Sequence, residues 1–157
     1  MAHGFTHVLV GGAAAALVWQ ATGPPGGEPT ANWLAEPQGW TVLAGASAVA
    51  LASHLLLDLM PHYDYLFASW QEVLLSLLAL AACFFLPPAP ASWVVLLGGF
   101  WGVVPDLEHG PYWRGWMRRR FFPTHSGWLP HRKCGPPASL LSQALLNALA
   151  LLIIGGV

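Results

Sequence analysis

Residues 40–65 read WTVLAGASAVALASHLLLDLMPHYDY, and this stretch decides the class of fold. It begins with a predominantly apolar run of about twenty residues, the length that a helix needs to cross a membrane. It ends with four ionisable side chains, which are His54, Asp58, His62 and Asp64. Ionisable groups within a membrane helix cost about 2.5–3.5 kcal/mol each and usually serve a function. The stretch therefore predicts a membrane helix with a functional site at one end.

The composition of the whole chain is that of a membrane protein. Hydrophobic residues make up 55% of its 157 residues and charged residues only 8%, whereas a soluble domain carries about 25% charged residues. So few charges cannot cover a surface that faces water. The two cysteines, Cys83 in an apolar run and Cys134 in a polar loop, form no CxxC pair, and we expect neither a disulfide nor a cysteine metal site.

Four further apolar segments accompany the one at 40–60. They cover residues 5–21, 70–86, 89–104 and 138–157. Pro61 ends the 40–60 segment, because proline cannot continue a helix. We predict an all-α fold, in which residues 1–157 form one polytopic membrane bundle of about five transmembrane helices. The segments 5–21 and 89–104 are short for a span, so a re-entrant or partly inserted helix is the alternative for these two.

The basic residues predict the orientation of the chain in the membrane. All six lie between the fourth and fifth segments: Arg114, Arg118, Arg119, Arg120, Arg132 and Lys133. Loops that are rich in lysine and arginine stay in the cytoplasm. We therefore expect a basic cytoplasmic loop at about 105–137, with the N-terminus on the same side of the membrane.

On this topology all seven histidines fall at the cytoplasmic ends of the predicted helices. The candidate metal ligands at this face are His3, His7, His54, Asp58, His62, Asp106, His109 and His125. His3 and His7 share one helix face, as do His54 and Asp58, because residues four apart are neighbours on a helix. Imidazole and carboxylate together suit Zn, with Mn or Fe(II) as alternatives. A set this large suits either one ion or two.

Structural roles are the alternatives for several of these residues. They are an interfacial hydrogen bond for His3, a buried ion pair for His54 and Asp58, a polar helix end for Asp106 and a turn for His125. An acid at the C-terminal end of a helix opposes the helix dipole. A bound cation would compensate for this at Asp106, and so the metal interpretation is preferred there.

The basic loop has two interpretations. In one, it sets the topology and contacts anionic lipid headgroups, which attract each basic residue by about 1 kcal/mol. In the other, Arg118, Arg119 and Arg120 bind the phosphate of a substrate, since a guanidinium group pairs with phosphate through two parallel hydrogen bonds. The interleaved Trp113 and Trp116 favour a loop that lies in the lipid interface. The segment is too short, and the chain too apolar, for nucleic-acid binding to be expected.

Four motifs together resemble those of a known family. They are the N-terminal TH before a helix of small residues, SHLLLDLMPH, VVPDLEHG and THS. They are similar to motifs of the bacterial membrane-bound metal-dependent hydrolases, the LexA-regulated inner-membrane hydrolases and their relatives. In this chain SHLLLD precedes PDLEH instead of following it, and Glu108 stands where the family usually has aspartate. The resemblance implies a protein of the bacterial inner membrane with a His/Asp metal site and hydrolase activity. It carries over to His7, His54, Asp58, Asp106, His109 and His125.

We therefore expect metal-assisted hydrolysis of a lipid-linked ester at the cytoplasmic leaflet. A phosphoester is the preferred substrate. Asp64 or Glu108 would accept the proton, and the three consecutive arginines would hold the charge of the substrate. The competing interpretations are a membrane transporter, a haem-binding protein and a scaffold with a structural metal. A transporter needs its polar groups near the bilayer midplane, and the many acids beside the histidines disfavour haem.

Overall fold

The computed structural model describes residues 4–24, 33–63, 69–89, 91–130 and 134–157. Two of the predicted site residues, His3 and Asp64, lie outside these ranges. Within them the chain is helical and contains no strand, only an isolated bridge at His62. The all-α prediction is thus confirmed.

Each predicted apolar segment forms one long helix. The long helices are α1 (Gly4–Thr22), α2 (Pro37–Leu59), α3 (Ser69–Phe85), α4 (Ala91–Val103) and α7 (Pro136–Gly155). The short elements are η1 (Trp33–Ala35), η2 (Val104–Glu108), α5 (His109–Trp113) and α6 (Pro123–Ser126). Two of the long helices begin with proline. Pro37 and Pro136 occupy the first turns of α2 and α7, where the missing N–H costs no hydrogen bond.

Three helices, α1, α2 and α7, are long and apolar enough to cross a membrane. Helix α3 has 17 residues and α4 only 13. At 1.5 Å per residue, α4 is about 20 Å long, which is less than the roughly 30 Å of a hydrocarbon core. The chain is compatible with a membrane protein, and the count of about five spans stays a prediction.

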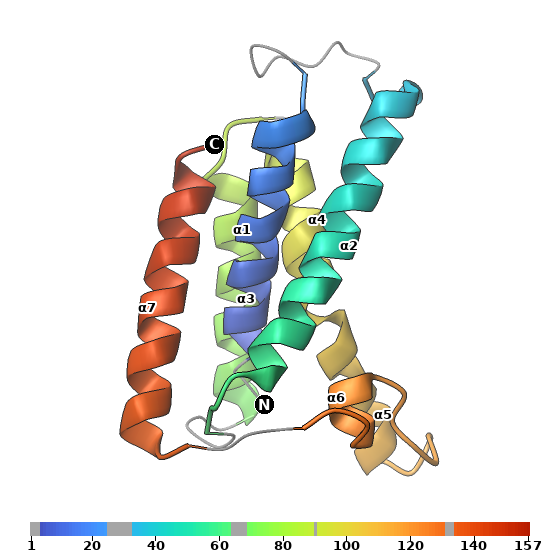
Figure 1. Cartoon of the computed structure of the whole chain (residues 1–157), viewed down its shortest axis with the longest axis vertical. Coiled ribbons are helices and arrows are strands. Elements are labelled where there is room, and N and C mark those ends of the chain that lie inside the picture. The colour runs from blue at the N-terminus through green and yellow to red at the C-terminus, as the bar shows by residue number, and fades with distance from the viewer. Residues whose placement is uncertain (1–3, 25–32, 64–68, 90, 131–133) are drawn as a thin grey trace.

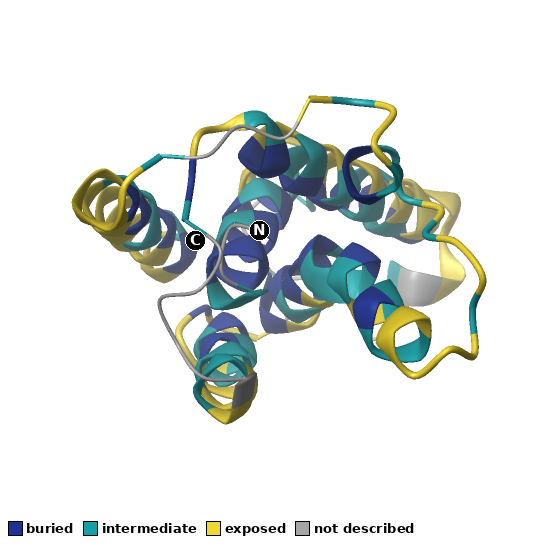
Figure 2. Cartoon of the chain, turned by 90° about the horizontal axis from the view of Figure 1, so that it is seen from below, coloured by how far each residue is buried: buried dark blue, intermediate teal, exposed yellow. Residues whose placement is uncertain are grey.

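Helix α1 lies in the middle of the bundle and contacts the other four long helices (Figure 1). The N-terminal end of α1 lies at the same end of the molecule as α5 and α6, and the C-terminus lies at the opposite end (Figure 1). Seen along the bundle, the buried faces turn towards α1 and the exposed faces point outwards (Figure 2). The geometry therefore gathers the ends of several helices beside α5 and α6.

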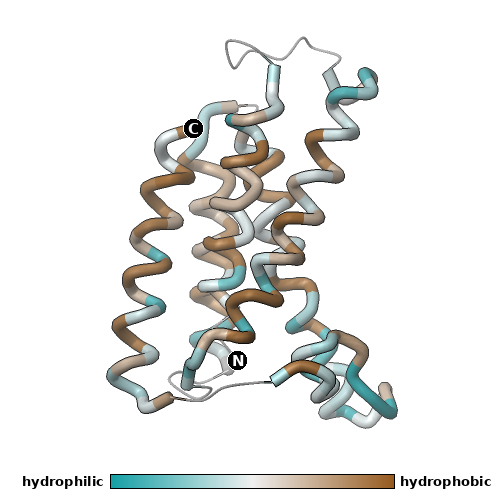
Figure 3. The backbone as a smooth tube through the Cα atoms, in the orientation of Figure 1, coloured by the Kyte–Doolittle hydropathy of each residue, from teal (hydrophilic) through white to brown (hydrophobic). Residues whose placement is uncertain are grey.

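The long helices are largely apolar along their length (Figure 3), and many of their large apolar side chains are exposed. Leu56 on α2, Val73 on α3 and Leu145 on α7 are each more than 60% exposed. Exposed apolar surface of this extent is unfavourable in water and favourable against lipid. The most hydrophilic stretch that the structure describes is the segment around α5 and α6 at one end of the bundle (Figure 3).

Glycine residues allow α1 and α4 to pack in close contact. A Cβ atom on Gly11 would lie 2.6 Å from the carbonyl oxygen of Gly98, and one on Gly102 would overlap the carbonyl oxygen of His7. Membrane helices use small residues in this way to bring their backbones together. The close crossing places His7 of α1 beside the last turn of α4.

Candidate metal centre

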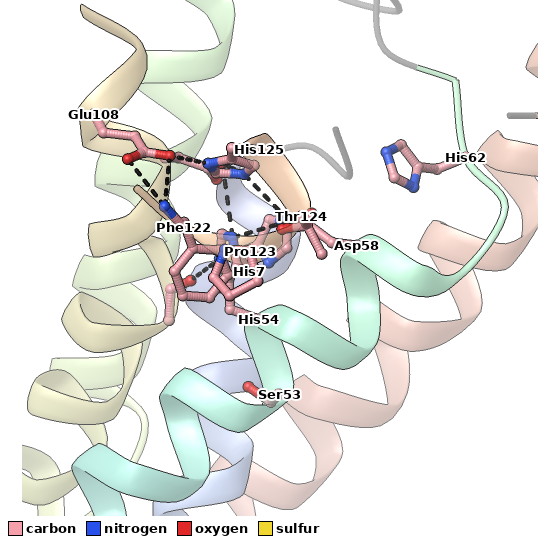
Figure 4. A network of polar contacts seen from close by, with 12 residues as sticks. His7, Ser53, His54, Asp58, His62, Glu108, Phe122, Pro123, Thr124 and His125 are labelled. Carbon is pink, nitrogen blue, oxygen red and sulfur yellow. Dashed lines mark hydrogen bonds and ion pairs between the residues drawn. The ribbon is translucent and has the colours of Figure 1, made fainter. Parts of the chain in front are cut away.

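Six predicted ligands converge at the end of the bundle that carries α5 and α6. They are His7 from α1, His54 and Asp58 from α2, Asp106 from η2, His109 from α5 and His125 from α6. Figure 4 shows His7, His54, Asp58 and His125 gathered at one point, although they come from three different helices. The turn at η2 follows from Pro105, which ends the α-helical pattern after Val103. This turn brings Asp106 back towards α2.

Asp58 is the hub of the cluster and is completely buried. Its Oδ1 lies 3.4 Å from Nε2 of His7. Its Oδ2 lies 3.3 Å from Nε2 of His54 and 3.2 Å from Nε2 of His125. The hydroxyl of Thr124 donates a hydrogen bond of 2.5 Å to the same Oδ2. One carboxylate thus faces three imidazole nitrogens.

Asp106 approaches the cluster from η2, whereas Asp58 belongs to α2. The side chain of Asp106 is 14% exposed. Its Oδ1 lies 3.6 Å from Nε2 of His125 and 4.0 Å from Nε2 of His54. Three groups of residues bring their ligand atoms within 4.8 Å of one another: His7, His54 and Asp106; His54, Asp58 and His125; Asp106, His109 and His125. Six of the predicted ligands therefore form one continuous set of donors.

Many polar atoms of this set are buried without a hydrogen bond in the described part of the chain. They are both ring nitrogens of His7 and of His109, Nε2 of His54 and His125, Oδ1 of Asp58 and both carboxylate oxygens of Asp106. Buried polar groups are nearly always hydrogen-bonded. Imidazole nitrogens and carboxylate oxygens that face one another without such bonds are the ligands that a divalent cation takes. The residues thus fit a divalent metal ion.

Two histidines are held so that their Nε2 atoms point into the cluster. Nδ1 of His54 lies 2.7 Å from the carbonyl oxygen of Gly102, and Nδ1 of His125 lies 2.7 Å from Oε1 of Glu108. A carbonyl or carboxylate oxygen can only accept, so each Nδ1 carries the proton and donates it. The lone pair of each ring is then on Nε2, as in metal sites whose ligand histidines are oriented by outer hydrogen bonds.

Glu108 anchors one wall of the centre. Its carboxylate accepts hydrogen bonds from the backbone N–H groups of Phe121, at 2.8 Å, and Phe122, at 3.3 Å, as well as from His125. Burial opposes its ionisation, but these donors outweigh burial and hold the pKa of Glu108 below its usual value. The sequence suggested Glu108 as a proton acceptor, and that role stays a prediction. Its contacts position His125, a role that the sequence alone did not indicate.

The pKa values of the two histidines of the short helices shift in opposite directions. Burial lowers the pKa of His109 to about 4, and the nearby His125 and Arg120 lower it too. Burial also disfavours the charged form of His125, but the carboxylates of Asp58, Asp106 and Glu108 outweigh it and raise its pKa. His109 is therefore neutral at pH 7 and able to donate a lone pair, while a cation at His125 competes with the carboxylates' preference for the protonated ring.

Replacing Glu108 with glutamine should weaken Zn²⁺ binding by about 10- to 100-fold, the usual cost of removing an outer hydrogen-bond partner of a ligand histidine. The amide would place an NH₂ group against the donors of Phe121, Phe122 or His125, and the ring would lose its orientation. A competition titration of the purified protein against a Zn²⁺ chelator measures the change. Glu36→Gln, at the far end of α2, serves as the control, and equal affinity in both variants would contradict the assigned role.

His62, a further predicted ligand, is not brought into the centre. Figure 4 shows it apart from the other labelled histidines. Its Nδ1 lies 2.7 Å from the carbonyl oxygen of Met60, and its own carbonyl accepts a hydrogen bond from Cys134. None of the three donor groups that the described residues form includes it. The reason is Pro61, which ends α2 and turns the chain away from the cluster.

Thr124 is a site residue that the sequence reasoning missed. Its hydroxyl is buried and binds Asp58 directly. Its signal in the sequence is the motif PTHS at residues 123–126, in which Thr124 directly precedes the predicted ligand His125. Threonine beside a candidate ligand is a weak signal, because a hydroxyl side chain also serves turns and caps.

A cavity of about 490 Å³ opens beside the centre. It is lined by Tyr112, Arg118, Arg119, Arg120, Phe121, His125, Ser126 and Trp128. The three predicted substrate-binding arginines thus share one cavity with His125. The guanidinium group of Arg120 lies 5.1 Å from the centre of the Tyr112 ring, where the π-electrons favour a cation. The cavity joins a positively charged wall to one of the candidate metal ligands, His125.

Comparison of the chain with protein-family models, with curated proteins and with solved structures gives no match. The candidate metal centre therefore rests on the chain's own residues and their geometry. The relationship to the membrane-bound metal-dependent hydrolases, which its motifs suggest, stays a prediction.

Proposed function

We propose that this protein is a membrane-embedded, metal-dependent hydrolase that cleaves a lipid-linked phosphoester at the cytoplasmic leaflet of a bacterial inner membrane. The observation that carries the proposal is the arginine-lined cavity, which reaches His125 of the buried His/Asp cluster. Anionic groups bind where guanidinium groups and a cation face one cavity. The cavity therefore suits a phosphate group held next to the metal ligands.

The roles of the side chains follow from their contacts. His54 and His125 offer Nε2 lone pairs, because Gly102 and Glu108 hold their Nδ1 protons. Thr124 fixes the rotamer of Asp58. A divalent ion in such a centre supplies Lewis acidity, which activates water and polarises a phosphoryl oxygen. The arginines would hold the non-reacting oxygens of the substrate and orient its phosphorus towards the centre.

The lipid substrate is argued from the surroundings of the cavity. Trp113, Trp116 and Trp128 are 72%, 74% and 83% exposed, and exposed tryptophan beside basic residues is typical of a membrane–water interface. In this proposal the five long helices cross or enter the bilayer, with α3 and α4 as the short ones. The basic loop then lies at the cytoplasmic headgroups. A water-soluble substrate would gain nothing from a site at this depth.

The double change Arg118→Gln and Arg119→Gln tests the proposed substrate site. We expect kcat/KM to fall by at least roughly 100-fold, mainly through KM, because each lost arginine removes a hydrogen bond to a charged group, which contributes about 1.5–3 kcal/mol. The assay is release of inorganic phosphate from phosphatidic acid and prenyl phosphates in mixed micelles, with and without Zn²⁺ or Mn²⁺. The metal content of the variant should equal that of the wild type.

Arg114→Gln is the matched control for this experiment. Arg114 belongs to the same basic loop but lies against the ring of Trp116 rather than along the cavity. An equal loss in both proteins would indicate a general effect of loop charge. A wild type without metal-dependent phosphate release from either lipid class would contradict the proposed reaction.

A further inference from the structure

We propose that the centre holds two divalent cations bridged by Asp106, one bound by His7 and His54 and the other by His109 and His125. The inference rests on the proposed function in one respect, since both require that the cluster binds metal. It goes further in assigning the number of ions and the ligands of each.

The four histidine rings form two pairs. The ring centres of His7 and His54 are 3.9 Å apart, and those of His109 and His125 are 4.3 Å apart. Between the pairs, His54 and His125 are separated by 5.5 Å. The first pair comes from α1 and α2, and the second from α5 and α6. The spacing thus divides the rings into two sets, each of which can serve one ion.

Asp106 is the residue that the two sets share. It forms one group of donors with His7 and His54 and another with His109 and His125. Both of its carboxylate oxygens are buried and make no hydrogen bond to the described residues, so each oxygen is available to one ion. A carboxylate that bridges in this way suits the separation of about 3.5–4 Å found in two-metal sites. Asp58 faces both sets as well, because it contacts His54 and His125 through the same oxygen.

A single ion would leave part of the cluster unused. A four-coordinate ion takes four ligands at most, whereas six side chains offer donors here. An ion bound by His54, Asp58 and His125 would leave His109, which is 4% exposed and whose buried ring nitrogens make no hydrogen bond to any described residue. Buried imidazole nitrogens need a partner. A second ion between Asp106 and His109 supplies it.

The balance of charge also favours two ions. Among the described residues, the centre contains three carboxylates, those of Asp58, Asp106 and Glu108. With neutral histidines, one divalent ion would leave the centre with a net negative charge, which repels a phosphoester. Two divalent ions would give it one net positive charge and attract the same group. A centre of this kind can clamp the attacking and leaving oxygens of a displacement.

Counting the bound ions tests the inference without an activity assay. Protein purified in detergent is loaded with Mn²⁺, freed of excess metal and analysed by elemental analysis and electron paramagnetic resonance. We expect about two ions per chain and the exchange-coupled signal of a Mn²⁺ pair, as for a two-metal site. His109→Ala should retain about one ion with an uncoupled signal. His62→Ala, which removes a buried histidine outside the cluster, should retain both ions and the coupling.

Asp106→Asn is the second variant, because it keeps the size of the side chain and should also abolish the coupled signal. Circular dichroism and gel filtration confirm that each variant remains helical and monodisperse. A wild type with one ion would overturn the two-ion inference and leave a one-metal hydrolase intact. A wild type without metal would overturn the proposed function as well. Two coupled ions in folded His109→Ala would overturn the assignment of His109.

Discussion

Replacing Asp58 with asparagine should abolish metal-dependent turnover and lower metal affinity by more than about 100-fold, because even outer-shell changes cost 10- to 100-fold. Its two carboxylate oxygens face His7, His54 and His125 at 3.2–3.4 Å. Asparagine removes the negative charge and points an NH₂ donor at one of these groups. Elemental analysis and the phosphate-release assay on the same preparation measure both effects.

The matched control is Ser53→Ala, one residue before His54 on α2. The hydroxyl of Ser53 donates to the carbonyl of Ala50 in its own helix, at 2.7 Å, and Figure 4 shows it away from the cluster. This variant should keep both metal and activity. Full turnover in Asp58→Asn would show that the cluster is not the site of the reaction.

Gly102→Ala should have the largest effect on stability. We expect the free energy of unfolding to fall by about 1–3 kcal/mol, as for other overpacked interfaces, although alanine favours a helix over glycine by about 1 kcal/mol. A Cβ at residue 102 would overlap the carbonyl oxygen of His7 and force α1 away from α4. The same shift would move His7 out of the cluster and displace the carbonyl that binds His54. Thermal unfolding in detergent and the metal content should therefore fall together.

Gly155→Ala provides the comparison for this prediction. Gly155 is in α7, and a Cβ there would meet no atom of the described structure within 4 Å. Its stability and metal content should equal or exceed those of the wild type. If Gly102→Ala unfolds at the wild-type temperature, the close crossing of α1 and α4 does not hold the centre together.

Much of the fold was predictable because a helix depends on its own segment. Each of the five apolar segments became one helix, and α2 ends at Leu59, before Pro61. The number of helices that cross the membrane does not follow from the apolar segments in the same way. Segment 89–104 contains enough apolar residues to enter a membrane, but Pro105 and the turn at η2 limit α4 to 13 residues. The length of an apolar run is therefore a poor predictor of the length of its helix when a proline lies nearby.

The sequence predicted most of the residues that form the candidate centre, but not how they contact one another. Six of the eight proposed ligands converge in the structure. They were predictable because histidine and aspartate are rare in so apolar a chain and stand out at the ends of its helices. His62 shares a helical spacing with Asp58, yet the break at Pro61 separates the two in space. No local pattern could show that Glu108 binds His125, since the two lie 17 residues apart and meet only when η2 and α6 pack together.

The sequence by itself determined an all-α chain, the position of each helix and the residue types at one end of the bundle. These depend on local composition, on the length of apolar runs and on proline, all of which act within a segment. Only the tertiary structure decided which histidines pair, which oxygens face them and which of their nitrogens is free. The physical reason is that the geometry of the candidate ligands depends on how α1, α2 and α4 cross. The crossing of α1 and α4 follows from how closely glycine lets their backbones approach.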